Sequence, residues 1–354
     1  MVDLLALTAE LVDVRSESFA EGPLVDRLEQ ELSSLGHLEV TRVGDNLVAR
    51  TMLGRPLRLL VAGHTDTVPA DGNERARIEG DVLSGVGSAD MKGGLAVALH
   101  LARTVPEPAV DVTYVFYARE EVAAHHNGLA ELLRERPDLL VGDCALLGEP
   151  TDGTIEAGCQ GALRLEVRLA GARAHTARPW MGRNAIHRLG PVLAALAEYE
   201  SRTPTIDGCT YREAVQAVGV EGGVSGNVVP DRAVLRVHHR FAPDRTASEA
   251  EAWFRSFLAP HLEDGDQIDV QDVSAACPPS LGHPLLSALI ERHGLEVRAK
   301  LGWTDVARFA ELGVPAANFG PGDATLAHTR DEHLERAPLE RVLATMQDLL
   351  TRGA

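Results

Sequence analysis

The sequence predicts an α/β fold: a mostly parallel sheet flanked by helices, with a smaller ferredoxin-like α+β domain inserted into it. A length of 354 residues allows a large core and favours two domains over one. Strands alternate with helices near both ends of the chain, which is typical of a parallel sheet with helices on both faces. Between these parts, apolar and polar residues alternate as in half-exposed strands. We therefore expect residues 1–160 and 276–354 to form one discontinuous domain and residues 161–275 the inserted one.

The first part of the chain contains most of the predicted parallel sheet. Pro23 is suited to open a helix and Gly36 to end it, and Gly44-Asp45-Asn46 suits a hairpin turn. The expected elements are helices around 4–12 and 23–35, strands at 38–43, 47–51 and 57–63, a helix at 91–104, a strand at 110–118, a helix at about 127–136 and a strand at 144–148.

The middle part has the order β-α-β-β-α-β of a ferredoxin-like unit. Its expected elements are strands at 163–169, 214–221, 230–241 and 268–273, with helices at about 183–199 and 248–258. A sheet of this kind leaves edge strands available for pairing, so we expect a homodimer formed through residues 161–275. The last part returns to the α/β style, with helices at 284–293, about 304–312 and 338–352 and a strand at 314–319.

Composition excludes several classes of partner. A net charge of −18 argues against binding to nucleic acid or to an anionic membrane. No apolar run approaches the roughly 20 residues needed to cross a bilayer, and the N-terminus has no basic leader. The four cysteines are scattered without a Cys-x-x-Cys pair, as expected of reduced thiols. These features predict a cytoplasmic protein that acts on a small molecule.

The strand at 57–63 ends in Gly63-His64-Thr65-Asp66. The carboxyl ends of parallel strands are where open α/β sheets bind their ligands. His64 and Asp66 are two residues apart, so they point the same way on an extended backbone. His64 can then bind a metal through one ring nitrogen while Asp66 orients the other. Taken alone, the pair is better explained by a strand that simply runs into a polar loop.

Other strand and loop ends supply matching ligands: Asp90, Glu121, Glu149 and His328. Imidazole and carboxylate without thiolate suit zinc, cobalt or manganese. Five ligands with three carboxylates suit two metals about 3.5–4 Å apart that share one carboxylate. Singly, Asp90 could cap a helix, Glu120 and Glu121 could be a solvated acidic pair, and the others could be surface residues. Their joint occurrence at successive strand ends favours the metal site.

These motifs resemble the dinuclear zinc metallopeptidase family of aminoacylases, carboxypeptidase G and acetylornithine deacetylase. The resemblance rests on Gly-His-Thr-Asp-Thr-Val-Pro at 63–69, Ser-Ala-Asp-Met-Lys-Gly-Gly at 88–94, Glu-Glu at 120–121 and Gly-Glu-Pro-Thr at 148–151, and it extends over nearly the whole chain. It implies a zinc-peptidase-like catalytic domain with an inserted lid and dimerisation domain. It also implies a ligand set for two Zn²⁺ ions, for which Co²⁺ or Mn²⁺ could substitute: His64 and Glu149 on one, Glu121 and His328 on the other, and Asp90 as the bridge.

The resemblance also implies roles for residues that do not bind metal. Glu120 would be the general acid and base, and Asp66 the partner that orients His64. His175 would stabilise the oxyanion, from the partner subunit in many such proteins, with Asn227 as its companion. Arg178 and Arg240 are candidates for binding substrate carboxylates, since guanidinium pairs bidentately with carboxylate. Thr304 and Gly322 are candidates for completing the pocket.

Within the family, the segments 302–309 and 318–323 resemble the desuccinylase branch. This implies metal-dependent hydrolysis of N-succinyl-LL-2,6-diaminopimelate to succinate and LL-2,6-diaminopimelate, for lysine and diaminopimelate synthesis. Val86 stands where many members carry arginine, and Gln160 where some desuccinylases do; both departures bear more on the substrate than on the metal site. Alternatives that the residues leave open are a related N-acyl-amino-acid deacylase, a dipeptidase and a non-catalytic metal-binding scaffold.

Overall fold

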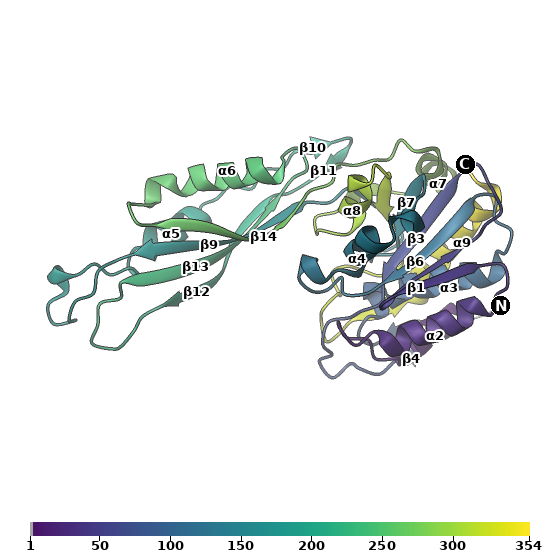
Figure 1. Cartoon of the computed structure of the whole chain (residues 1–354), viewed down its shortest axis with the longest axis horizontal. Coiled ribbons are helices and arrows are strands. Elements are labelled where there is room, and N and C mark those ends of the chain that lie inside the picture. Colours follow the sequence, from purple (N-terminus) through teal and green to yellow (C-terminus); the bar gives the residue numbers. More distant parts are fainter. Residues whose placement is uncertain (1–2) are drawn as a thin grey trace. The chain divides into compact units, whose positions relative to one another are not determined.

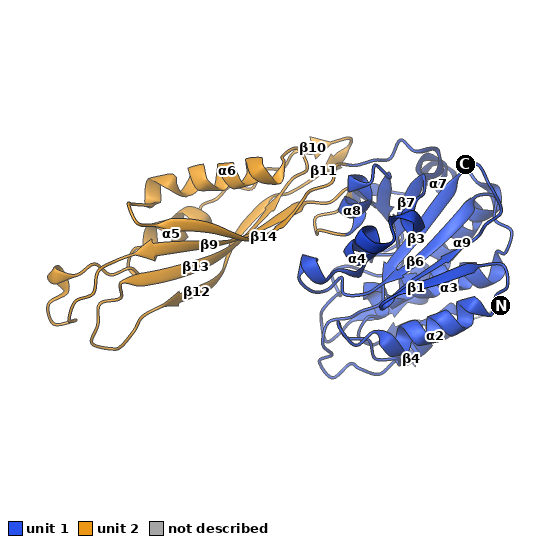
Figure 2. Cartoon of the chain, viewed as in Figure 1, with its two compact units in different colours: residues 1–157, 279–298, 305–354 blue, residues 158–278, 299–304 orange. Residues whose placement is uncertain are grey.

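The computed structural model describes residues 3–354, and it divides into two compact units (Figures 1 and 2). Unit 1 comprises Met1–Ala157, Pro279–Arg298 and Asp305–Ala354, and unit 2 comprises Gly158–Pro278 and Ala299–Thr304. The sequence-based boundaries placed residues 299–304 in the larger domain, whereas here they group with unit 2. Hydrogen bonds explain this: the backbone N–H of Gln160 donates to Lys300 O at 3.3 Å, and Trp303 Nε1 donates to Ala275 O at 3.2 Å.

An eight-stranded sheet forms the centre of unit 1, in the order β1-β2-β6-β3-β7-β16-β8-β15. Its middle strands are parallel: β3 pairs with β6 and β7, and β7 with β16. The flanking pairs β1–β2, β2–β6 and β16–β8 are antiparallel. The strands are β1 (Glu39–Val43), β2 (Asn46–Arg50), β3 (Arg58–His64), β6 (Asp111–Tyr117), β7 (Cys144–Leu147), β8 (Ile155–Ala157), β15 (Val297–Ala299) and β16 (Ala316–Asn318).

Helices cover both faces of this sheet, as predicted (Figure 1). One apolar core joins α1, α2, α3, α7 and α9 to alternate residues of the central strands, such as Leu59 and Val61. On the other face α4 packs against β2, and α8 packs against β7 and β16. The helices of unit 1 are α1 (Leu4–Val12), α2 (Gly22–Ser33), α3 (Gly93–Thr104), α4 (Gly128–Glu135), α7 (Pro284–His293), α8 (Val306–Glu311) and α9 (Arg336–Arg352).

A second, three-stranded sheet in unit 1 was not predicted. Its strands are β4 (Arg77–Glu79), β5 (Val82–Ser84) and β17 (His333–Glu335), in the order β17-β5-β4. Strands of three residues are too short to show a periodic pattern, and β17 pairs with a strand far away in the sequence. Between β5 and α3 lies the turn Ser88–Lys92, in which Asp90 (φ −120°, ψ 92°) and Met91 (φ −134°, ψ 39°) have non-helical backbone angles.

Unit 2 is a four-stranded antiparallel sheet in the order β12-β13-β9-β14. Its elements follow the predicted β-α-β-β-α-β order, with one added hairpin: β9 (Gly161–Ala170), α5 (Leu189–Ala197), β10 (Thr205–Ile206), β11 (Cys209–Thr210), β12 (Ala214–Gly222), β13 (Arg232–Phe241), α6 (Ala247–Leu258) and β14 (Gln267–Ser274). Helix α5 begins later than predicted because Pro191 is tolerated only in the first turn of a helix, which places the start at Leu189.

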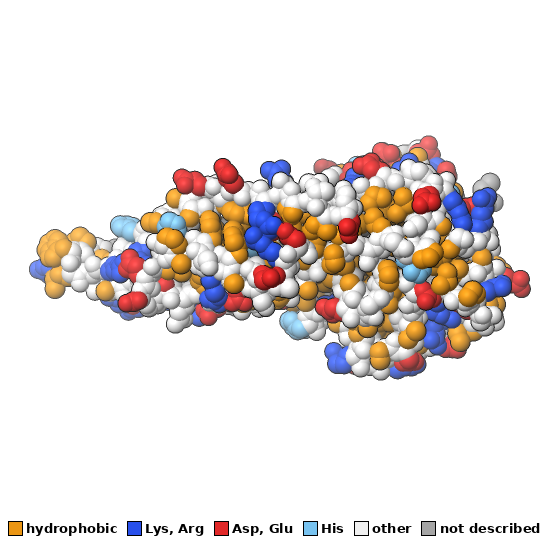
Figure 3. All heavy atoms as spheres, turned by 90° about the horizontal axis from the view of Figure 1, so that it is seen from above, with side chains coloured by type: hydrophobic (Ala, Val, Ile, Leu, Met, Phe, Trp, Pro, Cys, Tyr) orange, Lys and Arg blue, Asp and Glu red, His pale blue; other side chains and the backbone are white. Residues whose placement is uncertain are grey.

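Exposed hydrophobic side chains occur in unit 2 (Figure 3). Trp180 and Met181 are 77% and 69% exposed, and Val218 and Val220 on β12 are 63% and 52% exposed. None of the helices within residues 3–354 is long and apolar enough to span a membrane.

Candidate metal centre

The carboxyl ends of three neighbouring parallel strands bring the predicted ligands to one edge of the large sheet. β3 ends at His64, whose partner in register is Tyr117, the last residue of β6. Glu120 and Glu121 follow Tyr117 closely, and Glu149 follows the end of β7 in the same way. The order β6-β3-β7 therefore places these side chains next to one another.

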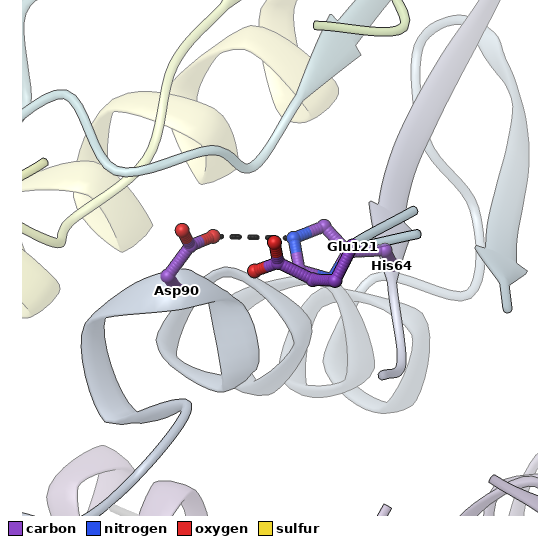
Figure 4. A group of neighbouring side chains, drawn as sticks. All are labelled: His64, Asp90 and Glu121. Atoms are coloured by element: carbon purple, nitrogen blue, oxygen red, sulfur yellow. Dashed lines mark hydrogen bonds and ion pairs between the residues drawn. The ribbon is translucent and has the colours of Figure 1, made fainter. Parts of the chain in front are cut away.

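His64, Asp90 and Glu121 each offer one ligand atom, and these atoms lie within 4.8 Å of one another (Figure 4). His64 Nε2 lies 3.1 Å from Asp90 Oδ1. A fourth predicted ligand joins them, since His328 Nε2 lies 2.8 Å from Glu121 Oε1 and 3.5 Å from Asp90 Oδ2. Asp90 thus lies between the two histidines, the place expected of a bridging carboxylate.

Glu149, the fifth predicted ligand, is 5% exposed. Its negative charge contributes to the raised pKa of both His64 and Glu120. The cluster is buried at His64, which is 1% exposed, and opens to solvent at His328, whose side chain is 52% exposed.

The charges of this cluster fit a bound cation. Burial alone would lower the pKa of His64, but the carboxylates of Asp66 and Asp90 hold it well above the usual value. Hydrogen bonds to Asp90 and Glu121 raise the pKa of His328 to about 10. In each case a proton on the ring would compensate the charge of the carboxylates that Nε2 faces. A divalent metal bound by the same atoms would take over that compensation, so the residues present fit a metal centre.

Asp66 has a larger structural role than the sequence suggested. It is fully buried, and its Oδ1 lies 3.5 Å from His64 Nδ1. Its two oxygens also accept hydrogen bonds from the backbone N–H groups of Glu120 at 3.0 Å and Glu121 at 3.1 Å. Ser18 Oγ donates to Asp66 Oδ2 at 2.8 Å. One carboxylate therefore fixes the histidine and the backbone of the Glu120–Glu121 pair together.

Glu120 lies in surroundings that disfavour its charged form. Burial raises the pKa of Glu120 well above its usual value, and the charges of Glu149 and Glu121 raise it further. A carboxyl group with a raised pKa holds and returns a proton near neutral pH.

Glycines let the backbones around the cluster approach closely. A Cβ on Gly94, near the start of α3, would lie 2.2 Å from Gly148 O. A Cβ on Gly320 would lie 2.3 Å from the same oxygen, and one on Gly322 would lie 2.3 Å from Ala89 O. Gly322, expected at the substrate pocket, is packed against the backbone of the turn that carries Asp90.

Comparison with protein families gives this arrangement an identity. The sequence profile of Peptidase family M20/M25/M40 matches residues 60–352. The chain belongs to this family. M20 membership makes it a hydrolase that acts on an amide bond, in a metal-dependent family.

Relatives cover nearly the full chain. A Mycobacterium tuberculosis protein named succinyl-diaminopimelate desuccinylase DapE is 51% identical over 99% of this chain and 97% of its own length. A Corynebacterium glutamicum succinyl-diaminopimelate desuccinylase is 44% identical over 99% of this chain and 96% of its own. Among solved structures, a tripeptidase from Staphylococcus aureus superposes with a TM-score of 0.80 at 21% identity, over 98% of this chain and 97% of that one. The structural likeness shows that the M20 fold is shared.

The residues predicted for the M20 lid lie in unit 2. His175 is exposed, its Nδ1 accepts a hydrogen bond from Ala177 N at 3.0 Å, and its neighbour Thr176 N donates to Asn227 O at 3.0 Å. The backbone N–H of Arg178 donates to His175 O at 2.8 Å. The structure therefore brings His175, Arg178 and Asn227 together on adjacent loops.

The other predicted substrate residues of unit 2 lie apart from that group. Arg240 is near the carboxyl end of β13, opposite Ala162 of β9. Thr304 is 3% exposed, and its carbonyl faces the Cys159 thiol at 3.7 Å.

Gln160, one of the two departures from the family pattern, is buried and accepts a hydrogen bond from Arg212 N at 2.9 Å. Val86, the other, is 9% exposed beside the turn that carries Asp90.

Sequence reasoning missed buried carboxylates that hold the loops of the centre. Glu21 Oε1 accepts a hydrogen bond from Arg119 N at 3.1 Å, next to Glu120. Glu332 Oε1 accepts from the backbone of the Asp90 turn. Neither stands at a strand end or in a ligand-spaced motif, so only the tertiary structure reveals them.

Proposed function

We propose that this chain is a metal-dependent hydrolase that converts N-succinyl-LL-2,6-diaminopimelate to succinate and LL-2,6-diaminopimelate. Three predicted ligands gathered around Asp90 (His64, Glu121 and His328) and the raised pKa of Glu120 support amide hydrolysis. The choice of substrate is supported by relatives 51% and 44% identical that are named for this reaction.

In this proposal two Zn²⁺ ions, replaceable by Co²⁺ or Mn²⁺, are held by His64 and Glu149, by Glu121 and His328, and by Asp90 between them. Metals bound there would act as Lewis acids that lower the pKa of water and polarise a carbonyl oxygen.

The chain's own residues then carry the proton. Glu120 accepts a proton from the attacking water and passes it to the leaving amine, which its raised pKa favours. Asp66 keeps Glu120 in place by its hydrogen bond to the Glu120 backbone. His175 and Asn227 donate to the oxyanion that forms on the amide carbonyl.

Recognition of the substrate falls to groups that bind carboxylates. Succinyl-diaminopimelate carries several carboxylates, and the guanidinium groups of Arg178 and Arg240 suit them. Thr304 and the Gly322 backbone complete the pocket in this proposal.

Assembly and location belong to the same proposal. A homodimer would form through unit 2, whose β12 is an edge strand of its sheet and carries exposed valines. His175 would then act in the site of the partner subunit. The four cysteines are buried and scattered along the sequence, which supports a reducing, cytoplasmic setting.

A hydrolysis panel tests the function. Metal-free and metal-loaded protein would be assayed with succinyl-diaminopimelate, acetylornithine and simple dipeptides. We expect the highest kcat/KM with succinyl-diaminopimelate, loss of activity on chelation, and recovery with Zn²⁺, Co²⁺ or Mn²⁺. Faster turnover of acetylornithine or a dipeptide would replace the substrate, and activity that resists chelation would refute the metal mechanism.

A further inference from the structure

Glu332 is a buried carboxylate that binds the backbone of the turn carrying Asp90. Its side chain is 2% exposed, and its Oε1 accepts hydrogen bonds from Ala89 N and Asp90 N, both at 3.0 Å. A hydrogen bond in a place shielded from water is electrostatically stronger than one at the surface. The position of the Asp90 backbone therefore depends on where Glu332 lies.

Glu332 also lies on the segment that carries another predicted ligand. His328 precedes it by four residues, and β17 begins directly after it. β17 pairs with β5, the strand that leads into the Asp90 turn, and Gly85 N donates to Glu332 O at 3.1 Å. The small sheet and the Glu332 side chain thus join the Asp90 turn to the His328 segment at three places.

The packing around this junction leaves little freedom for the turn. A Cβ on Gly93 would lie 2.6 Å from Leu334 Cδ2, so the two segments are in close contact. On the far side of the turn, the buried Lys92 Nζ donates to Leu11 O at 3.1 Å and Val14 O at 2.8 Å. The turn is therefore held by Glu332 before Asp90 and by Lys92 after it.

We propose that Glu332 is the positioning residue that sets Asp90 against His328 before any metal binds. The inference rests on the metal centre of the proposed function and adds a residue outside its ligand set. Asp90 Oδ2 and His328 Nε2 lie 3.5 Å apart on segments that are otherwise remote in the sequence. Without the Glu332 carboxylate, metal binding itself would have to order the Asp90 turn. The free energy spent on that ordering would be lost from the metal affinity.

The test measures metal affinity directly, by competition with a chromophoric chelator for Zn²⁺ on metal-free protein held well below its thermal midpoint. We expect Glu332→Ala to weaken Zn²⁺ binding by about 10–100-fold, the usual effect of removing a group that orients a ligand. Glu332→Gln keeps an oxygen that can accept both N–H groups, so it should retain most of the affinity. If the alanine variant does not fold, Glu332→Asp carries the test, because its shorter side chain withdraws the acceptor from both amides.

Asp111→Ala is the matched control. Asp111 is 3% exposed and accepts hydrogen bonds from Leu53 N at 2.9 Å and Arg55 N at 2.8 Å, at the amino end of β6 and so away from the metal cluster. Its substitution should lower thermal stability as that of Glu332 does while leaving Zn²⁺ affinity unchanged.

Three results would overturn the inference. Wild-type affinity in Glu332→Ala, or in Glu332→Asp where that variant is used, refutes the positioning role alone. An equal loss of affinity in Asp111→Ala shows a general effect of destabilisation and refutes it too. A wild-type chain that binds no Zn²⁺ overturns the proposed function, and this inference with it.

Discussion

The carboxylates around His64 differ in what their oxygens already bind. Both oxygens of Asp66 accept hydrogen bonds from backbone amides, so this group fixes the residues around the site and leaves metal binding to others. Glu121 instead faces His328 at 2.8 Å, where a metal ligand would lie. The backbone N–H of Glu120 donates to Asp66, and the pKa of the Glu120 side chain is raised. Adjacent glutamates can therefore have different tasks because their surroundings differ.

Glu120→Gln separates metal binding from proton transfer. The amide has nearly the same shape but cannot exchange a proton, so metal content should stay unchanged while kcat falls by about 10²–10⁴-fold. Elemental analysis and steady-state kinetics on the same preparation measure both. Loss of metal together with activity would make Glu120 a ligand and contradict its assignment as acid and base.

His239 is a residue whose burial should make unit 2 sensitive to acid. It is fully buried on β13 among Trp253 and Phe254, and within the described residues neither ring nitrogen has a hydrogen-bond partner. Burial and the nearby charge of Arg245 lower the pKa of His239 from 6.5 to about 4. The unfolded chain then binds this proton more readily, so stability is full above about pH 6.5 and is lost as pH falls towards 4.

His239→Leu should remove that loss. Between pH 7.5 and pH 5 the wild type should lose about 2 kcal/mol more of its unfolding free energy than the variant does. Urea unfolding at the two pH values, followed by tryptophan fluorescence, gives the comparison. Parallel pH dependence of the two proteins would show that His239 is not the responsible group.

At the scale of elements, the centre depends on how closely α3 approaches the end of β7. Gly94 lies against Gly148, the residue before Glu149, with no room for a side chain. Long elements such as α3 and α9 follow their apolar periodicity, so the sequence predicted them. The three-residue strands β5 and β17 have no such pattern and were found only in the structure.

Gly94→Ala and Gly190→Ala form a pair with opposite expected effects. The first drives a methyl group into the Gly148 carbonyl, which should cost about 1–3 kcal/mol and lower metal content by displacing Glu149. The second adds a methyl group to α5 where nothing lies within 4 Å, and should stabilise by about 0.4–1 kcal/mol. Calorimetry and metal analysis measure both. A Gly94→Ala protein with normal stability and metal content would contradict the close approach.

At the scale of the whole molecule, the proposed dimer predicts how activity depends on assembly. Sedimentation should give a mass of twice 37.9 kDa for the wild type. Charges on the exposed edge strand, as in Val218→Lys with Val220→Lys, should produce a monomer. If His175 acts in the partner's site, this monomer should bind metal normally and lose most of its turnover. A fully active monomer would place His175 in its own subunit's site.

The sequence alone predicted the main sheet with its helices, the order of elements in unit 2 and the ligand types. Helices and strands of seven or more residues carry a readable period, and the carboxyl ends of parallel strands must converge. That is why His64, Asp90, Glu121 and His328 could be proposed before the structure placed them together.

Tertiary structure decided what holds those ligands in place. Ala89 and Glu332 are 243 residues apart, and Asp66 accepts a hydrogen bond from the backbone of Glu120, 54 residues away. Such contacts leave no local pattern, because a buried acid that binds backbone amides has the same letter as one on the surface. The residue types at the strand and loop ends thus predict the chemistry. The fixed positions that this chemistry needs arise only when distant segments pack together.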